Sequence, residues 1–171
     1  KNIFVPMTVG GGICSVEDAH SLLRAGADRI AINSAAVRRP ELIKEIVKTL
    51  GSQCLVLSIE AKKNASCTWE VYLDNGREKT GKKVNYWVKK VLELGVGELM
   101  VTSIDQEGTC EGCDIELLKM VTSISTVPVI ASGGIGKLDH ISDAIIKGGV
   151  DAVAMADILH YKKYNVEEIR K

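Results

Sequence analysis

The sequence predicts an α/β fold, a (β/α)8 TIM barrel of which this chain covers about the third to the eighth strand-helix units. Short β-branched runs alternate with helical stretches every ~20 to 30 residues, which is typical of βαβ units around a parallel sheet. One strand-helix-strand segment occurs twice, and each copy opens on a glycine-rich strand end. We therefore expect a single, incomplete barrel domain over residues 1–171.

The expected strands are mostly apolar, as strands buried on both faces of a parallel sheet should be. They are placed at residues 4–9, 29–33, 55–60, 98–104, 127–132 and 152–156. A helix is expected over 16–25 with Ser15 as its N-cap, and another over 40–50 with Pro40 in its first turn. Glycines stand where helices should end, at Gly26, Gly51, Gly95 and Gly148.

Residues 68–82 interrupt this alternation. A strand-like run at 69–73 is followed by Asp74-Asn75-Gly76-Arg77, which is a hairpin turn signal. The segment lies in a connection from a strand to a helix. It is expected to form a small flap over one end of the barrel.

The internal repeat is the most informative feature. Gly11 and Asp28 recur as Gly133 and Asp151, with the same spacing to within one residue. A two-fold repeat suggests a barrel made of two similar halves, whereas a doubly wound sheet gives no reason for one. Six units are two short of a closed barrel, so the remaining quarter would belong to a longer form of the chain or to another chain.

Composition excludes several classes of function. Lys plus Arg equals Asp plus Glu at 22 each, so no net field favours nucleic acid or an anionic membrane. No apolar run approaches the ~20 residues of a membrane span. Five cysteines, an odd number, are unlike a secreted disulfide framework and are expected to be reduced. The chain is expected to be cytoplasmic, without a membrane or nucleic-acid partner.

The two glycine clusters indicate phosphate chemistry. Glycines between a parallel strand and a helix let backbone N–H groups approach an anion, with the positive end of the helix dipole behind them. Either cluster alone is equally explained by a tight turn. Because both occur at repeat-related positions, Gly11-Gly12 and Gly133-Gly134 predict a long substrate with a phosphate at each end.

Four motifs resemble those of the cyclase subunit of imidazole glycerol phosphate synthase, in histidine biosynthesis. They are TVGGGI at 8–13, ADRIAINSAA at 27–36, TSIDQEGT at 102–109 and ASGG at 131–134. The resemblance implies a barrel that adds ammonia from a glutaminase subunit to a bisphosphorylated ribulosyl aminoimidazole carboxamide nucleotide. The products would be imidazole glycerol phosphate and aminoimidazole carboxamide ribotide, and no cofactor is implied.

The resemblance also implies a catalytic carboxylate at Glu60, where the family has Asp. The family's other catalytic aspartate lies on a first strand that this chain does not include. Glu at a strand end is able to act as a general acid or base, but its extra methylene moves the carboxyl by roughly 1 Å, a shift that can cost about 100-fold in rate. The alternative is a structural carboxylate paired with Lys62.

Further site residues follow from the resemblance. Phosphate contacts are expected at Gly11, Gly12, Asn33, Ser34, Glu107, Gly108, Gly133, Gly134 and Asp157, and lining residues at Thr102 and Ser132. Two positions depart from the family: Glu107 replaces Asp, and Asp157 replaces Ser. A carboxylate beside a phosphate dianion is repulsive unless a cation intervenes, so Asp157 leaves that phosphate group in doubt.

These departures keep two other functions open. Some bacteria carry a paralogue that supplies ammonia for converting an acetamido to an acetamidino group on surface sugars, and residues 154–161 resemble that branch. The other is a related sugar-phosphate isomerase with no glutaminase partner.

Charged and polar residues at the opposite end of the strands argue against the isomerase. By resemblance, Asp28, Arg29, Gln53 and Glu98 form the glutaminase docking face and a gate to the ammonia channel. The alternative is that these groups only stabilise the bottom rim.

The C-x-x-C pair at 110–113 lacks the roughly four ligands that zinc needs, so no metal is expected.

Overall fold

The computed structural model describes residues 4–170 and contains one curved sheet of eight strands. Six strands are parallel, in the order β1 (Thr8–Gly10), β2 (Arg29–Ile32), β3 (Leu55–Lys63), β6 (Glu98–Ser103), β7 (Val129–Ser132) and β8 (Ala152–Ala154). The other two, β4 (Trp69–Leu73) and β5 (Glu78–Lys83), form an antiparallel hairpin attached to β3. This is the predicted α/β fold, an open part of a parallel barrel.

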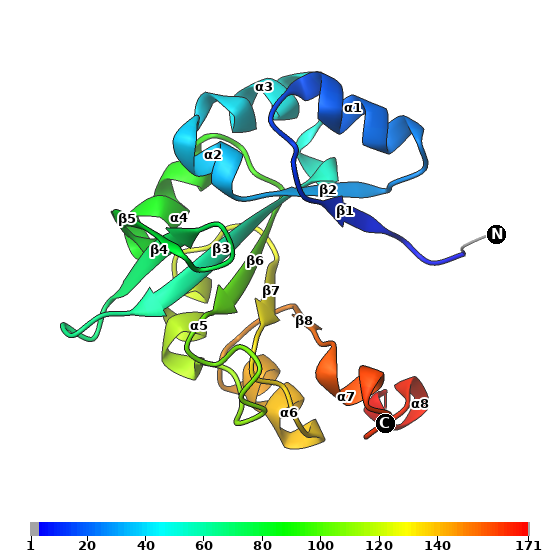
Figure 1. Cartoon of the computed structure of the whole chain (residues 1–171), viewed down its shortest axis with the longest axis vertical. Helices are drawn as coiled ribbons and strands as arrows, with labels where there is room; N and C mark the ends of the chain where they lie inside the picture. Colours follow the sequence, from blue (N-terminus) through cyan, green and yellow to red (C-terminus); the bar gives the residue numbers. More distant parts are fainter. Residues whose placement is uncertain (1–3, 171) are drawn as a thin grey trace.

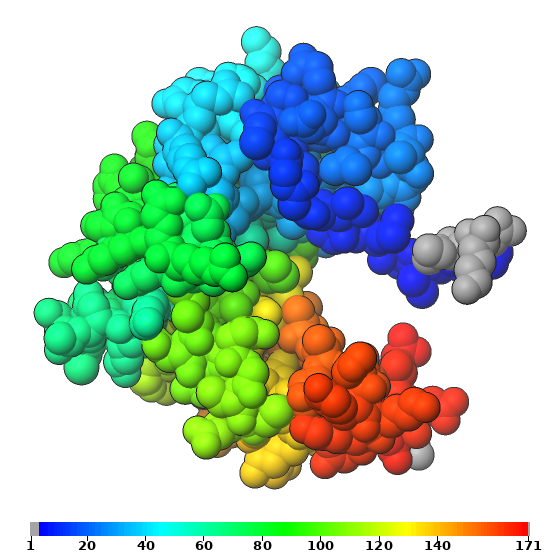
Figure 2. All heavy atoms as spheres, in the orientation of Figure 1, coloured from blue at the N-terminus to red at the C-terminus, as the bar shows by residue number. Residues whose placement is uncertain are grey.

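Most of the helices lie on the outer side of this sheet, and the last two follow β8 at the open end (Figure 1). They are α1 (Val16–Arg24), α2 (Ser34–Arg38), α3 (Glu41–Leu50), α4 (Val84–Glu93), α5 (Ile115–Thr122), α6 (Leu138–Ile146), α7 (Asp157–His160) and α8 (Val166–Ile169), with a 3-10 turn at Ser52–Cys54. The edge strands β1 and β8 do not meet, and the space between the two ends of the chain is open in Figure 2. The core lies between the sheet and α3, α4 and α5, where Leu42, Ile46, Trp87 and Leu117 are almost completely buried.

The strand predictions are confirmed in position, but several boundaries are corrected: β3 continues to Lys63, β8 ends at Ala154, and two strands begin later than predicted. The first strand begins at Thr8 instead of Phe4, and Phe4 is 90% exposed. The carboxylate of Asp28 accepts a hydrogen bond from the N–H of Met7. The pairing with β2 therefore starts one residue later, at Thr8. The strand expected from Val127 begins at Val129, because Pro128 has no N–H to donate.

Helix ends follow the local chemistry of the sequence. Ser15 caps α1 as predicted, in a reciprocal capping box with Asp18. The predicted glycines Gly26, Gly51 and Gly95 adopt positive φ after their helices. Gly148 is the exception: the left-handed residue there is Gly149, and Gly148 is instead packed against the carbonyl of Ala144.

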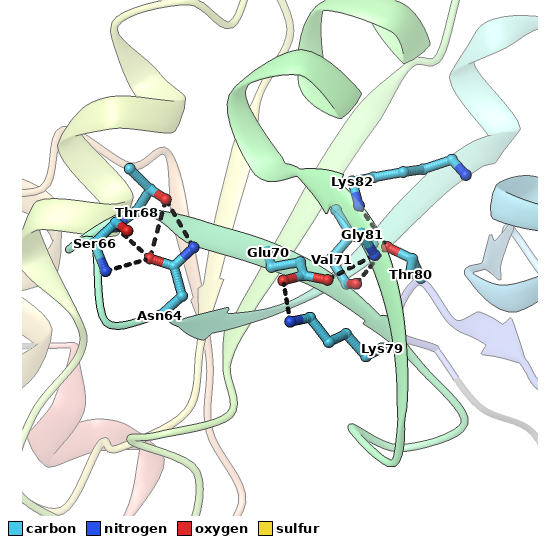
Figure 3. Close-up of polar contacts among 9 residues, drawn as sticks. All are labelled: Asn64, Ser66, Thr68, Glu70, Val71, Lys79, Thr80, Gly81 and Lys82. Carbon is cyan, nitrogen blue, oxygen red and sulfur yellow. Dashed lines mark hydrogen bonds and ion pairs between the residues drawn. The ribbon is translucent and has the colours of Figure 1, made fainter.

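The predicted flap is the hairpin of β4 and β5, shown in Figure 3. Glu70 is buried and accepts the N–H of Gly81 at 2.6 Å, and it also pairs with Lys79 at 3.3 Å. The Thr80 hydroxyl donates to the carbonyl of Val71 at 2.6 Å. These bonds fix the two strands to one another, so the turn between them has a defined position.

Candidate active site at the carboxyl ends of the strands

Three adjoining hollows form a groove along the carboxyl ends of the parallel strands. The first, of about 340 Å³, contains Gly11, Gly12 and Glu60. The second, of about 350 Å³, shares Glu60 with the first and leads to Thr102, Glu107 and Ser132. The third, of about 210 Å³, shares Glu107 and Ser132 and ends at Gly133, Gly134 and Asp157. The groove therefore joins the two glycine pairs, with Glu60 between them.

Glu60 is held over the groove by the hairpin. Its Oε2 accepts the N–H of Gly76 at 2.9 Å. Burial raises the pKa of this carboxyl, and the charge of Asp74 raises it further, while the Gly76 N–H and the Asn33 amide act in the opposite direction. A carboxyl whose pKa is raised in this way is suited to hold or transfer a proton.

The alternative role for Glu60, an ion pair with Lys62, is wrong. Lys62 is exposed, and its Nζ lies 5.9 Å from the centre of the Tyr72 ring. Glu60 forms no ion pair with any side chain in the part of the chain that the structure describes. Its carboxyl is therefore available to a bound molecule.

The first cradle consists of Gly11, Gly12, Asn33 and Ser34. Gly11 and Gly12 have φ of +105° and +71°, and no atom lies within 4 Å of where a Cβ would be. Glycine is required here by the backbone conformation and leaves open space beside it. Oδ1 of Asn33 is buried without a hydrogen-bond partner among the described residues. These features suit a pocket that a ligand completes.

An acidic side chain from the hairpin turn enters the same cradle. Oδ1 of Asp74 lies 3.3 Å from the Ser34 hydroxyl, and its Oδ2 accepts from Nη2 of Arg38 at 3.0 Å. Arg38 also binds Glu78 at 2.8 Å. Desolvation would raise the pKa of Asp74, but the hydrogen bond and charge of Arg38 hold it below its usual value. The hairpin turn is thus anchored to α2.

The second cradle consists of Glu107, Gly108, Gly133, Gly134 and Asp157. Gly133 and Gly134 also have positive φ, but here the glycines are closely packed. A Cβ on Gly134 would lie 2.0 Å from the carbonyl oxygen of Gly112. The glycines of this cluster therefore satisfy a tight contact and also line the groove.

The carboxylate of Asp157 has a cation beside it. Lys163 donates a short hydrogen bond to Asp157, and its Nζ lies 3.7 Å from Sγ of Cys110. This hydrogen bond lowers the pKa of Asp157 and raises that of Lys163. The expected repulsion of a phosphate by Asp157 is therefore reduced, because a cation does intervene.

At the opposite end of the sheet, Arg29 and Glu98 form an ion pair of 2.5 Å. These residues start β2 and β6, so the pair spans the intervening strand β3. Asp28 holds the backbone of Met7, and Gln53 donates to the carbonyl of Leu50 at 3.3 Å. The structure thus brings Arg29 and Glu98 together, while Asp28 and Gln53 each contact a backbone group.

In the described part of the chain, no metal-ligand cluster is found, and the thiol of Cys113 is not activated. Within residues 4–170 no three His, Cys, Asp or Glu side chains gather closely enough to hold a metal ion. Burial and then the charge of Asp114 raise the pKa of Cys113 to about 11, which makes it a poor nucleophile or ligand at neutral pH. None of the helices in that range has the length and apolar character needed to cross a membrane.

Sequence reasoning missed several groove residues. The sequence predicts Asp74 and Gly76 only as parts of a turn and does not single out Arg38, because the hairpin folds back over α2 from 36 residues away. Lys163 belongs to none of the motifs recognised in the sequence. Ser58 and Met100, which line the first two hollows, alternate with buried residues on β3 and β6, and that period-2 pattern is a signal that points to them.

The groove lies within the part of the chain that is similar to known proteins. The family model of histidine biosynthesis proteins matches residues 1–165. The chain is also 46% identical over 190 residues to the imidazole glycerol phosphate synthase subunit HisF of Methanocaldococcus jannaschii. That similarity covers all of this chain and 70% of the relative. Both cradles and Glu60 lie within the matched residues.

Proposed function

The chain belongs to the histidine biosynthesis protein family, and on this premise we propose that it is the cyclase subunit of an imidazole glycerol phosphate synthase. It would use ammonia from a glutaminase subunit and a bisphosphorylated ribulosyl aminoimidazole carboxamide nucleotide. The products would be imidazole glycerol phosphate and aminoimidazole carboxamide ribotide. One observation carries the proposal: Glu60 lies midway along a groove that joins two glycine cradles.

The groove accounts for how such a substrate would be held. One phosphate would bind backbone N–H groups at Gly11 and Gly12, and the other would bind those at Gly133 and Gly134. The reacting carbon and nitrogen atoms between the two phosphates would then lie beside Glu60. Its pKa, raised by burial, makes the carboxyl better able to take up a proton and to give it back.

The Arg29–Glu98 pair supports a role for a second subunit. It lies at the amino ends of the strands, opposite the groove, where ammonia made by a glutaminase would enter the barrel. We infer that this pair lies at the docking face and controls that entrance. Arg29→Gln should then lower turnover with glutamine and the glutaminase but leave turnover with added ammonia unchanged.

The surface-sugar paralogue is the second candidate, favoured by the departures at Glu60, Glu107 and Asp157 and by residues 154–161. Because Lys163 neutralises Asp157, a carboxylate at this position no longer argues against a phosphate. The deciding experiment is ammonia-dependent turnover of the bisphosphorylated substrate by the full-length protein, followed by absorbance. Turnover supports the cyclase. Absence of turnover with weak or no substrate binding favours the paralogue.

A further inference from the structure

The second cradle contains more negative charge than a phosphate site usually tolerates. Glu107 and Asp157 both line it, and backbone N–H groups alone would have to offset two carboxylates as well as a phosphate dianion. A cation must therefore contribute if this cradle binds phosphate. Among the described residues, the lysine that contacts a lining carboxylate of this cradle is Lys163.

The backbone directs Lys163 back toward the groove. Lys162 adopts a φ of +54°, and the N–H of Lys163 then donates to the carbonyl of Ile158 at 2.9 Å. Ile158 is completely buried, so this anchor is fixed. The segment follows β8 and α7 closely at the end of the sheet (Figure 1). As a result, the Lys163 side chain reaches Asp157 and Cys110 at the edge of the groove.

Nζ of Lys163 lies between two residues that line the third hollow. It donates to Oδ1 of Asp157 and lies 3.7 Å from Sγ of Cys110. An ammonium group has three donors, and the thiol is a weak acceptor, so one donor remains for a stronger acceptor. The Lys163 side chain is 41% exposed, so a ligand can reach that donor.

We propose that Lys163 is a phosphate ligand of the second cradle, and that Asp157 is the residue that positions it there. This inference rests on the proposed function, since it names an additional contact for one of the two substrate phosphates. In the free protein Asp157 holds the ammonium group at the edge of the hollow. When phosphate binds to Gly133 and Gly134, Lys163 shares its donors between Asp157 and a phosphate oxygen.

The test measures binding of inorganic phosphate to the full-length protein by NMR, with the backbone amides of Gly134 and Gly12 reporting on the two cradles. Lys163→Gln should raise the Kd at Gly134 by roughly tenfold or more, as expected for a lost hydrogen bond between charged groups. The Kd at Gly12 should not change. Lys162→Gln is the matched control, because it removes the same charge one residue earlier and should leave both values unchanged.

A second pair of variants separates a direct contact from simple neutralisation of Asp157. If Lys163 binds phosphate itself, Lys163→Gln will also weaken binding in the Asp157→Asn background, by a smaller factor, because the amide oxygen of the new side chain still accepts from the ammonium group but holds it less firmly. If Lys163 only cancels the charge of Asp157, its effect will vanish in that background, and the proposal is overturned. An unchanged Kd in Lys163→Gln alone overturns it too, and reduces the ion pair to a surface contact.

Failure of the proposed function gives a different result. If the Gly134 amide of the unmodified protein does not respond to phosphate, the second cradle is not a phosphate site, and both ideas are wrong for this end of the groove. If the amide responds but Lys163→Gln binds as the unmodified protein does, only the role of Lys163 is lost.

Discussion

The backbone N–H of Gly76 donates a 2.9 Å hydrogen bond to Oε2 of Glu60, and this contact joins the hairpin turn to the middle of the groove. Gly76 adopts a φ of +77°, and a Cβ there would lie 3.1 Å from Cδ1 of Ile104. The turn is therefore shaped to bring a backbone donor onto the carboxyl. Its position depends in turn on the bond between Asp74 and Arg38.

Glu60→Gln should abolish ammonia-dependent turnover while the substrate still binds. Gln keeps the shape and can still accept the Gly76 N–H, but it cannot transfer a proton, and loss of such a group costs roughly 10²- to 10⁴-fold. Steady-state kinetics with added ammonia measure the effect. Lys62→Gln, which changes an exposed neighbour on the same strand, should retain activity. Full activity in Glu60→Gln would remove Glu60 from the mechanism.

The same substitution should stabilise the protein at neutral pH. Because burial raises the pKa of Glu60 above its ordinary value of 4.5, the folded state binds this proton more tightly than the unfolded state does. The stability that this group contributes is complete at a pH below its ordinary pKa. It is lost as the pH rises through the pKa of the group in the folded state. At pH 7, therefore, Glu60→Gln should raise the free energy of unfolding.

Urea denaturation at pH 7, and again at about pH 4, measures this gain, which should shrink at the lower pH because both side chains approach neutrality there. Glu93→Gln, on the exposed side of α4, is the control and should show no such gain. A lower stability of Glu60→Gln at pH 7 would mean that the charged carboxylate is favoured in the fold, contrary to the direction of the pKa.

Much of the fold and of the groove was predictable because the relevant signals are local. Apolar runs placed the parallel strands, and glycines at strand ends placed both cradles on one edge, since parallel strands present their carboxyl ends together. The boundary errors have local causes as well, in the Asp28 side chain and in Pro128. What the sequence did not reveal was which side chains meet across long separations.

Arg38 and Lys163 illustrate this limit. Nothing near Arg38 in the sequence distinguishes it from Arg39, yet Arg38 holds the hairpin turn while Arg39 pairs with Glu45 at 2.7 Å on α3. The choice depends on where the hairpin folds, which is set by the pairing of β4 with β3. Likewise, Lys163 follows Lys162 directly, yet it is Lys163 that contacts Asp157, just after the positive φ of Lys162.

Arg38→Gln should loosen the hairpin turn and expose the Glu60 contact. Loss of the guanidinium frees Asp74 and Glu78 together, so the amide of Gly76 should exchange with solvent faster and turnover should fall. Hydrogen exchange followed by NMR measures the opening of the turn. Arg39→Gln, which removes an equal charge one residue away, should leave exchange at Gly76 unchanged. Equal protection of Gly76 in both variants would show that the strands alone hold the turn.

The glycines of the two cradles should differ in their tolerance of a methyl group. At Gly11 an added Cβ meets no atom within 4 Å, so Gly11→Ala should cost only the strain of a positive φ, roughly 1–3 kcal/mol. At Gly134 the same strain applies, and the methyl group would also meet the carbonyl oxygen of Gly112 at 2.0 Å. Moving that carbonyl adds an overpacking cost of roughly another 1–3 kcal/mol.

Gly134→Ala should therefore lower the free energy of unfolding more than Gly11→Ala does, and urea denaturation of the two variants gives the comparison. The N–H of Gly112 also donates to the carbonyl of Gly134 at 2.8 Å, so a shift of either loop breaks a hydrogen bond between them. Gly81→Ala, at a hairpin glycine with positive φ and open space, calibrates the cost of strain alone. Equal losses at Gly11 and Gly134 would mean that the Gly112 loop moves freely, and the second cradle would then lack the rigidity that the close packing implies.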